Sequence, residues 1–141
     1  MAEAGQRRSV AVILDSNFLF IPLQFGVDIF EELQRLLGGL VRCIVPSPVV
    51  EELQNLGRDA GPKARREADF ALALAGRCEV AEGDAGPGET VDDAILRLAL
   101  RKRCPVATND GRLRRRLRAE GIPVIYLRQR AYLDIDGAAR A

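Results

Sequence analysis

Short β-branched segments alternate along this chain with longer segments of helical periodicity. The short segments, each flanked by turn residues, are 10–14, 41–45, 78–81, 105–107 and 123–126. Apolar residues recur every three or four positions in the segments 27–37, 48–56, 62–75, 91–101 and 112–119. Buried parallel strands joined by helices form right-handed βαβ units. The alternation therefore predicts a layered α/β fold with a parallel sheet.

The length of 141 residues and the 48% hydrophobic content are typical of one domain with its own core. We expect a single domain over 1–141, with 1–9 and 128–141 as peripheral segments. The longest apolar runs, such as 10–14, are too short to cross a bilayer, and no secretory h-region follows the first residues. The sequence therefore predicts a cytoplasmic protein with no membrane partner.

The chain contains no histidine. This excludes Ser-His-Asp and Cys-His catalysis, histidine-ligated zinc or iron, and a histidine general base. The cysteines Cys43, Cys78 and Cys104 are widely spaced with no CxxC pair, which indicates reduced core thiols rather than a disulfide frame or a zinc site. Any chemistry must therefore use carboxylates, arginines, hydroxyls or a hard metal ion.

Acidic side chains follow the predicted strands or begin the helices after them. They are Asp15, the pair Glu51 and Glu52, the pair Asp92 and Asp93, and Asp110. All these positions lie at the carboxyl edge of a parallel sheet, where ligand sites form beside a topological switch. We therefore expect four carboxylates to converge there.

Helical spacing favours Glu52 over its neighbour Glu51. Val49, Leu53 and Leu56 are expected on the buried face of their helix. Glu52 is three residues after Val49 and four before Leu56, so it borders that face, whereas Glu51 points the other way.

The same test favours Asp92 over Asp93. Asp92 shares a helix side with Ile95 and Ala99, at spacings of three and seven residues. Asp93 is turned further toward solvent, so Asp92 is the better candidate for the site.

Clustered carboxylates without basic partners repel one another unless a divalent cation neutralises them. Mg²⁺ and Mn²⁺ prefer oxygen ligands, and a pair of such ions about 4 Å apart can clamp both reacting oxygens of a phosphodiester. A metal-activated water would then be the nucleophile. Each acid taken alone also fits a helix cap or a solvated first-turn residue, but four at one edge favour a metal site.

At these residues the sequence resembles the PIN-domain ribonuclease family. The family's ordered motifs stand here as Asp15, Glu52-Leu53, Asp92-x-x-Ile95-x-x-x-Ala99 and Thr108-Asn109-Asp110. The resemblance extends from residue 10 to about residue 127. It looks most like the branch of archaeal stand-alone PIN proteins and the PIN nucleases of ribosomal RNA processing.

The resemblance implies a three-layer Rossmann-like fold with about five parallel strands, and Mg²⁺- or Mn²⁺-dependent endonucleolytic cleavage of RNA, often by a homodimer. It implies that Asp15, Glu52, Asp92 and Asp110 are the catalytic residues and hold the metal. Asn17, Thr108 and Asp93 are the expected supporting residues. The doubled acid leaves open whether Asp92 or Asp93 is the third ligand.

Charge is distributed unevenly along the chain. Residues 1–100 hold 10 basic and 16 acidic side chains, whereas 101–141 hold 11 basic and 4 acidic ones. The predicted helix after Asp110 reads RLRRRLR, and its Arg112, Arg115 and Arg116 are candidates for binding RNA phosphates. The alternative is a solvated helix face.

Three other functions compete with the ribonuclease. A phosphotransfer domain also places Asp after a strand, but Asn17 stands where a phosphatase of that kind needs a second acid. A catalytically silent RNA-binding or assembly module would keep the fold without the chemistry. A toxin-type ribonuclease would be held by an antitoxin, so the candidate partners are RNA, a second copy, an antitoxin or a ribosome-assembly protein.

Overall fold

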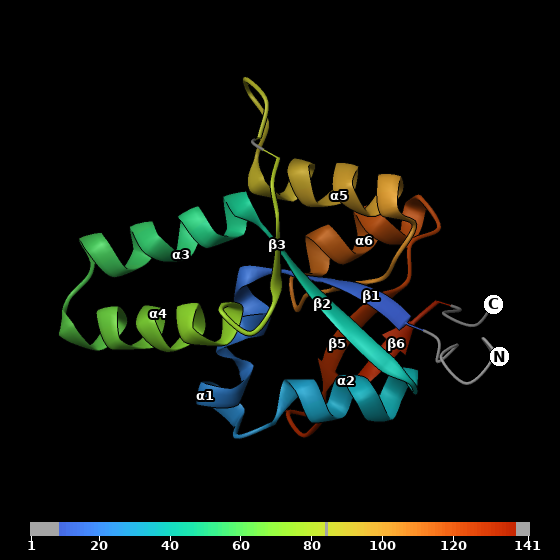
Figure 1. The fold of residues 1–141 in the computed structure, drawn as a ribbon, viewed down its shortest axis with the longest axis horizontal. Coiled ribbons are helices and arrows are strands. Elements are labelled where there is room, and N and C mark those ends of the chain that lie inside the picture. The colour runs from blue at the N-terminus through green and yellow to red at the C-terminus, as the bar shows by residue number, and fades with distance from the viewer. Residues whose placement is uncertain (1–8, 84, 138–141) are drawn as a thin grey trace, which may run out of the picture.

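The computed structural model describes residues 9–83 and 85–137. Within these residues a six-stranded sheet runs in the order β3-β2-β1-β4-β5-β6 (Figure 1). The strands are β1 Ser9–Leu14, β2 Leu40–Pro46, β3 Glu79–Ala81, β4 Val106–Ala107, β5 Val124–Arg128 and β6 Tyr132–Asp136. The first five pair in parallel, and β6 pairs antiparallel with β5. The predicted α/β fold with a parallel sheet is confirmed.

Helices cover both faces of the sheet. They are the 3₁₀ helix η2 Ser16–Phe20, α1 Ile21–Phe25, α2 Ile29–Leu37, α3 Ser47–Asp59, α4 Pro62–Ala75, α5 Val91–Lys102 and α6 Gly111–Ala119. Figure 1 shows α5 and α6 together on one side of the sheet, α2 on the other, and the α3–α4 hairpin projecting away from it. The buried stripes of α2, α5 and α6 consist of apolar residues at helical spacing, such as Leu113 and Leu117.

The strand order reverses between β1 and β4. The chain runs from β1 outward to β2 and β3, and then returns to the other side of β1 to form β4 and β5. Leu14 at the end of β1 lies opposite Ala107 at the end of β4. The Asp15 backbone N–H donates to the Ala107 carbonyl oxygen over 3.0 Å. The segments that follow β1 and β4 therefore begin side by side at the edge of the sheet. This is the topological switch at which α/β folds form ligand sites.

The segment after Leu127, expected to lie on the surface, instead contributes β6. Its first part turns at Gln129 and Arg130, which both have positive φ, and the Ala131 N–H donates to the Arg128 carbonyl oxygen over 3.1 Å. Alternating apolar and polar residues in β6 are typical of a half-buried strand. Residues 1–8 and 138–141 of the two predicted peripheral segments lie outside the described residues.

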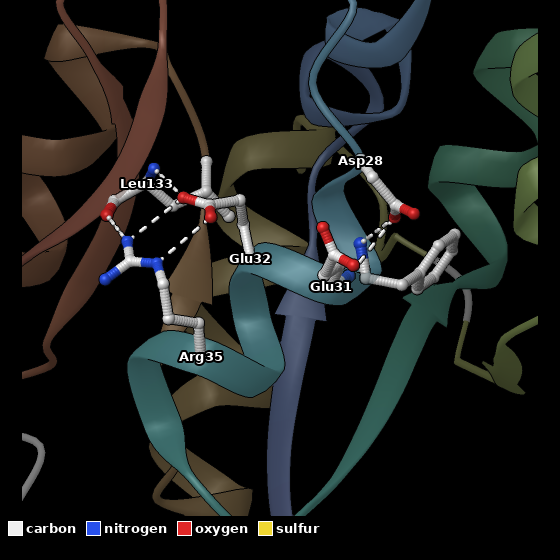
Figure 2. A network of polar contacts seen from close by, with 6 residues as sticks. Asp28, Glu31, Glu32, Arg35 and Leu133 are labelled. Carbon is white, nitrogen blue, oxygen red and sulfur yellow. Dashed lines mark hydrogen bonds and ion pairs between the residues drawn. The ribbon is translucent and has the colours of Figure 1, made fainter.

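Side chains of α2 close the free edge of β6 (Figure 2). The Leu133 N–H donates to Glu32 Oε1, and Arg35 Nη2 donates to the Leu133 carbonyl oxygen, each over 2.9 Å. Glu32 and Arg35 also form an ion pair of 3.0 Å. Asp28 begins the same helix by accepting bonds from the N–H groups of its first turn. Because these backbone groups of Leu133 are already bonded, another strand cannot pair with β6 at that position.

Candidate functional site

Asp15 is the centre of the polar cluster at the switch. It follows β1 directly and is 4% exposed. Its Oδ1 accepts from the Ser16 N–H over 2.7 Å, and its Oδ2 accepts from Thr108 Oγ1 over 2.8 Å and from Asn17 Nδ2 over 3.1 Å. The predicted supporting residues Asn17 and Thr108 therefore both bond directly to the carboxylate and fix its orientation.

A second set of bonds joins this cluster to β5. Asn17 Oδ1 accepts from the Asn109 N–H over 3.0 Å, and Asn109 Oδ1 accepts from the Leu127 N–H over 2.9 Å. The fully buried Thr108 accepts from the Asp110 N–H over 3.1 Å. No local sequence signal marks the role of Asn109, because its bonds reach residues 92 and 18 positions away.

Burial raises the pKa of Asp15 from its ordinary value of 3.8 to about 6. The bonds from Thr108 and Ser16 oppose this increase, because they favour the charged carboxylate. The charges of Asp92 and Glu52 add to it. The carboxylates predicted to converge from three different elements therefore influence one another across the site.

Asp92 and Asp93 have different environments although they are neighbours. Burial and the charge of Asp110 raise the pKa of Asp92. Asp93 Oδ2 accepts from the Thr90 N–H over 3.0 Å in a capping box, and its Oδ1 accepts from Arg116 Nη2 over 2.8 Å. These bonds lower the pKa of Asp93. Both oxygens of Asp93 accept hydrogen bonds that hold α5, whereas the charge of Asp92 acts on Asp15.

Asp110 and Glu52 complete the acidic edge. Asp110 caps α6 by accepting from the Arg112 N–H over 2.9 Å, and its charge influences Asp92. Glu52 lies half-buried on α3 and lines a groove of about 650 Å³. Within 9–83 and 85–137, no three acidic or thiol side chains come close enough to form a metal-binding group by themselves.

One prediction about α3 is wrong. Leu56 was expected on the buried face but is 48% exposed, whereas Val49 and Leu53 are fully buried. The helix continues to Asp59, and its last turns pack against α4 and not against the sheet, as Figure 1 shows. Leu56 therefore lies in the groove beside Glu52 instead of in the core.

The arginines of α6 fall into two groups. Arg114 and Arg118 pair with Asp136 of β6 at 2.9 and 3.4 Å, and the Arg114 guanidinium stacks over the Tyr126 ring at 3.9 Å. Their main role is to fasten the helix to the sheet.

The three predicted RNA-binding arginines differ in their partners. Arg116 is paired with Asp93. Arg112 and Arg115 are exposed, and their side chains form no hydrogen bond or ion pair within the described part of the chain. These two remain available to an anionic ligand.

A doubly wound sheet with carboxylates from β1, α3, α5 and the β4–α6 junction defines an α/β domain with an acidic site at its switch point. The chain belongs to the PIN-like domain family, whose model matches residues 12–130. In the part of the chain that the structure describes, no helix is both long and apolar enough to cross a membrane.

The relatives that match the chain include proteins named as ribonucleases and proteins named as rRNA-processing proteins. Ribonuclease VapC4 of Methanocaldococcus jannaschii is 31% identical over 129 residues, covering 89% of this chain and 96% of the relative. The rRNA-processing protein FCF1 of Saccharomyces cerevisiae is 31% identical over 125 residues, covering 86% of this chain and 62% of the relative. The equal identities do not separate the two kinds of relative.

A solved structure of the PIN domain endonuclease Utp24 superposes with a TM-score of 0.74. It is 27% identical, and the match covers 91% of this chain and 92% of that one. The predicted resemblance to PIN-domain ribonucleases, including the branch connected with ribosomal RNA, is therefore confirmed.

Proposed function

We propose that this protein is a divalent-metal-dependent endoribonuclease in which Asp15, Glu52, Asp92 and Asp110 form the catalytic site and hold Mg²⁺ or Mn²⁺. The observation that carries the proposal is the environment of Asp15. Its carboxylate is buried and is oriented by hydrogen bonds from Thr108 and Asn17. The charges of two other acids also act on it. Buried carboxylates with perturbed pKa values at a switch point are typical of catalytic sites.

The residues present fit a hard divalent cation. All the candidate ligands are carboxylate oxygens, and none is a nitrogen or sulfur atom. Mg²⁺ usually keeps several waters and binds through one or two carboxylates together with substrate phosphates. The carboxylates therefore need not form a complete ligand set by themselves, since water and RNA phosphate oxygens can supply the remaining ligands.

A bound divalent cation would supply an activated water and stabilise the charge that develops on the phosphodiester. The chain's own residues prepare the site for this. Thr108 and Asn17 donate to Asp15 Oδ2 and hold the carboxylate in one orientation. Asp93 accepts from Arg116 and caps α5, so it positions the helix that carries Asp92.

We assign the binding of RNA phosphates to the exposed arginines of α6. Asp110 caps this helix, so its first turn lies beside the acidic edge of the sheet. Arg112 and Arg115 have exposed guanidinium groups with no partner among residues 9–83 and 85–137, and such groups can pair with phosphate oxygens bidentately. The proposed substrate is therefore an RNA strand that passes over α6 with one phosphate at the acids.

The relatives suggest two settings for such an activity. One relative is named as a ribonuclease and the other as an rRNA-processing protein. We therefore consider a toxin-type ribonuclease held by an antitoxin and an enzyme that works on ribosomal RNA with assembly proteins. A homodimer belongs to the same proposal. In either setting the reaction at the acidic edge is the same, whereas a catalytically silent module would bind RNA without cleaving it.

The experiment compares cleavage of a labelled single strand of RNA by the parent and by Asp15→Asn. The reaction buffer contains Mn²⁺ or Mg²⁺. We expect cleavage by the parent, loss of cleavage with EDTA, and loss with Asp15→Asn while its circular dichroism is unchanged. Asp69→Asn, an exposed acid on α4, is the matched control and should cleave like the parent. Parental cleavage by purified Asp15→Asn would overturn the proposed site, and RNA binding without cleavage by the parent would favour the silent module.

A further inference from the structure

Two of the three cysteines are neighbours in space although 35 positions separate them in sequence. The β2–β3 register places Ile44 opposite Glu79 and Val45 opposite Val80. Cys43 and Cys78 each directly precede the first pair of this register, Ile44 and Glu79. Neighbouring strands lie about 4.8 Å apart. A disulfide requires Cα atoms about 4.4–6.8 Å apart, so residues at the start of two neighbouring strands are candidates for one.

The side chains of the pair lie close enough for each to influence the pKa of the other. Cys78 Sγ donates to the carbonyl oxygen of Leu74 on α4 over 3.6 Å. Both cysteines are free thiols. The two thiols are therefore neighbours in the reduced protein.

The two thiols differ in accessibility and in acidity. Cys43 is 9% exposed, whereas Cys78 is half-buried at the end of the α4–β3 connection. Cys43 and the charge of Arg77 lower the pKa of Cys78, whereas Cys78 and burial raise the pKa of Cys43. Cys78 is the more accessible thiol, so an oxidant reaches it first, and Cys43 is placed to react with it afterwards.

A cavity lies next to the chain segment that leads to Cys78. It has a volume of about 270 Å³ and is lined by Phe30, Leu74 and Arg77, with the Arg77 guanidinium 4.1 Å from the centre of the Phe30 ring. Arg77 precedes Cys78 in the chain, and Leu74 provides the carbonyl oxygen that accepts from Cys78. Cys78 itself does not line the cavity but follows directly on a residue that does.

We propose that Cys43 and Cys78 form a peroxide-sensitive dithiol site that closes to an intramolecular disulfide. In the first step Cys78 sulfur attacks a peroxide oxygen, the O–O bond breaks, and water leaves with formation of a sulfenic acid. In the second step Cys43 sulfur attacks Cys78 sulfur, the S–O bond breaks, and a second water carries away the thiol proton. The two sulfurs together lose two electrons, which the peroxide gains.

The closed form would tie a short edge strand to the body of the sheet. Within the described residues β3 has three residues and pairs only with β2. A disulfide between Cys43 and Cys78 would close a loop over residues 44–77 and restrict the unfolded chain. Oxidation is therefore expected to raise the melting temperature. This inference is independent of the proposed ribonuclease activity.

The test uses the full chain, reduced and then freed of reductant, with hydrogen peroxide as the oxidant. We expect the thiol count to fall from three to one, the intact mass to fall by two hydrogens, and a peptide map to join Cys43 to Cys78. Dithiothreitol should reverse the change. In the matched control Cys104→Ser, which removes the third, buried cysteine, the same disulfide should form and leave no free thiol.

Two further variants separate the steps. With Cys43→Ala the sulfenic acid at Cys78 should persist and be trapped by dimedone, whereas Cys78→Ala should leave the remaining thiols reduced. Should Cys43→Ala fail to fold, the map of the parent and of Cys104→Ser decides the question. A parent that retains all three thiols, a disulfide that includes Cys104, or disulfide-linked dimers as the main product would each overturn the proposal.

Discussion

The hydroxyl of Thr108 donates a 2.8 Å hydrogen bond to Asp15 Oδ2 across 93 positions of sequence. Each residue directly follows one of the two strands on either side of the topological switch. Thr108 is fully buried and also accepts from the Asp110 N–H. One side chain thus links the first acid of the site to the last.

Replacing Thr108 tests this link. Thr108→Val should raise the pKa of Asp15 further, because it removes a bond that favours the charged form. It should also reduce the free energy of unfolding at neutral pH by about 1.5–3 kcal/mol, the usual value for a hydrogen bond to a charged group. Thr108→Ser, which keeps the hydroxyl, should preserve most of both properties. The measurements are urea unfolding and a carboxyl NMR titration, and equal behaviour of the two variants would contradict the assignment.

The raised pKa of Asp15 predicts a pH-dependent stability without metal. Because the folded-state value of about 6 exceeds the ordinary 3.8, the folded state binds the proton more tightly than the unfolded state. The resulting stabilisation is fully present below the unfolded pKa and is lost as the pH rises through about 6. The loss by neutral pH is about 3 kcal/mol.

Urea unfolding between about pH 4 and pH 7 in EDTA measures this effect. The parent should lose stability over this interval relative to Asp15→Asn, which has no proton to release at that position. Asp69→Asn, an exposed control, should follow the parent. Parallel curves for the parent and Asp15→Asn would show that the Asp15 pKa is not raised in the folded protein.

Divalent cations should stabilise the folded protein through the acidic edge. A ligand that binds only the folded state raises the melting temperature with its concentration. Millimolar Mn²⁺ should therefore raise the melting temperature of the parent at neutral pH more than that of Asp15→Asn. EDTA should reverse the increase. If Mn²⁺ leaves the melting temperatures of the parent and of the Asp69→Asn control unchanged, the result argues against a metal site at these carboxylates.

Much of the fold was predictable because its signals are local. Buried strands appear as short β-branched runs, and Asp15 and Asp110 stand at the ends of two of them. Helical spacing favours Asp92 over Asp93 as the site residue, and this stays a prediction, while the bonds from Thr90 and Arg116 engage both oxygens of Asp93.

The parts that sequence reasoning missed depend on contacts between distant segments. Asn109 bonds to Asn17 and to the Leu127 backbone, and no local pattern encodes either contact. The hairpin to β6 was missed because Gln129 and Arg130 occupy positive-φ positions where glycine or asparagine normally marks the turn.

That turn yields a stability prediction. Gln129 and Arg130 are the two central residues of the hairpin turn, and both have positive φ. Asn-Gly is the favoured pair at such positions, and a non-glycine residue there costs about 1–2 kcal/mol. The double variant Gln129→Asn, Arg130→Gly should therefore raise the free energy of unfolding by about 1 kcal/mol or more. Arg128→Gly, outside the two positive-φ positions, is the control and should not stabilise. Unfolding in urea decides, and a less stable double variant would contradict the turn conformation.

The arginines of α6 give the final prediction, which concerns binding of RNA. Arg112→Ala with Arg115→Ala should weaken binding to all single-stranded sequences alike, because the exposed guanidinium groups are proposed to contact phosphates and not bases. The slope of log affinity against log salt should fall by about 0.7 for each lost phosphate contact. Arg116 is the weaker choice for this test because it also holds Asp93.

A titration with a labelled single strand at several salt concentrations measures the slope, with Ca²⁺ in place of Mg²⁺ to limit cleavage. The matched control is Arg65→Ala with Arg66→Ala, which removes the same charge from exposed positions on α4. If the α4 variant lowers the slope as much as the α6 variant, the effect is one of net charge alone. If the α6 variant leaves both slope and affinity unchanged, the RNA path must lie elsewhere, and Arg128 and Arg130 beside the β5–β6 turn are the next residues to replace.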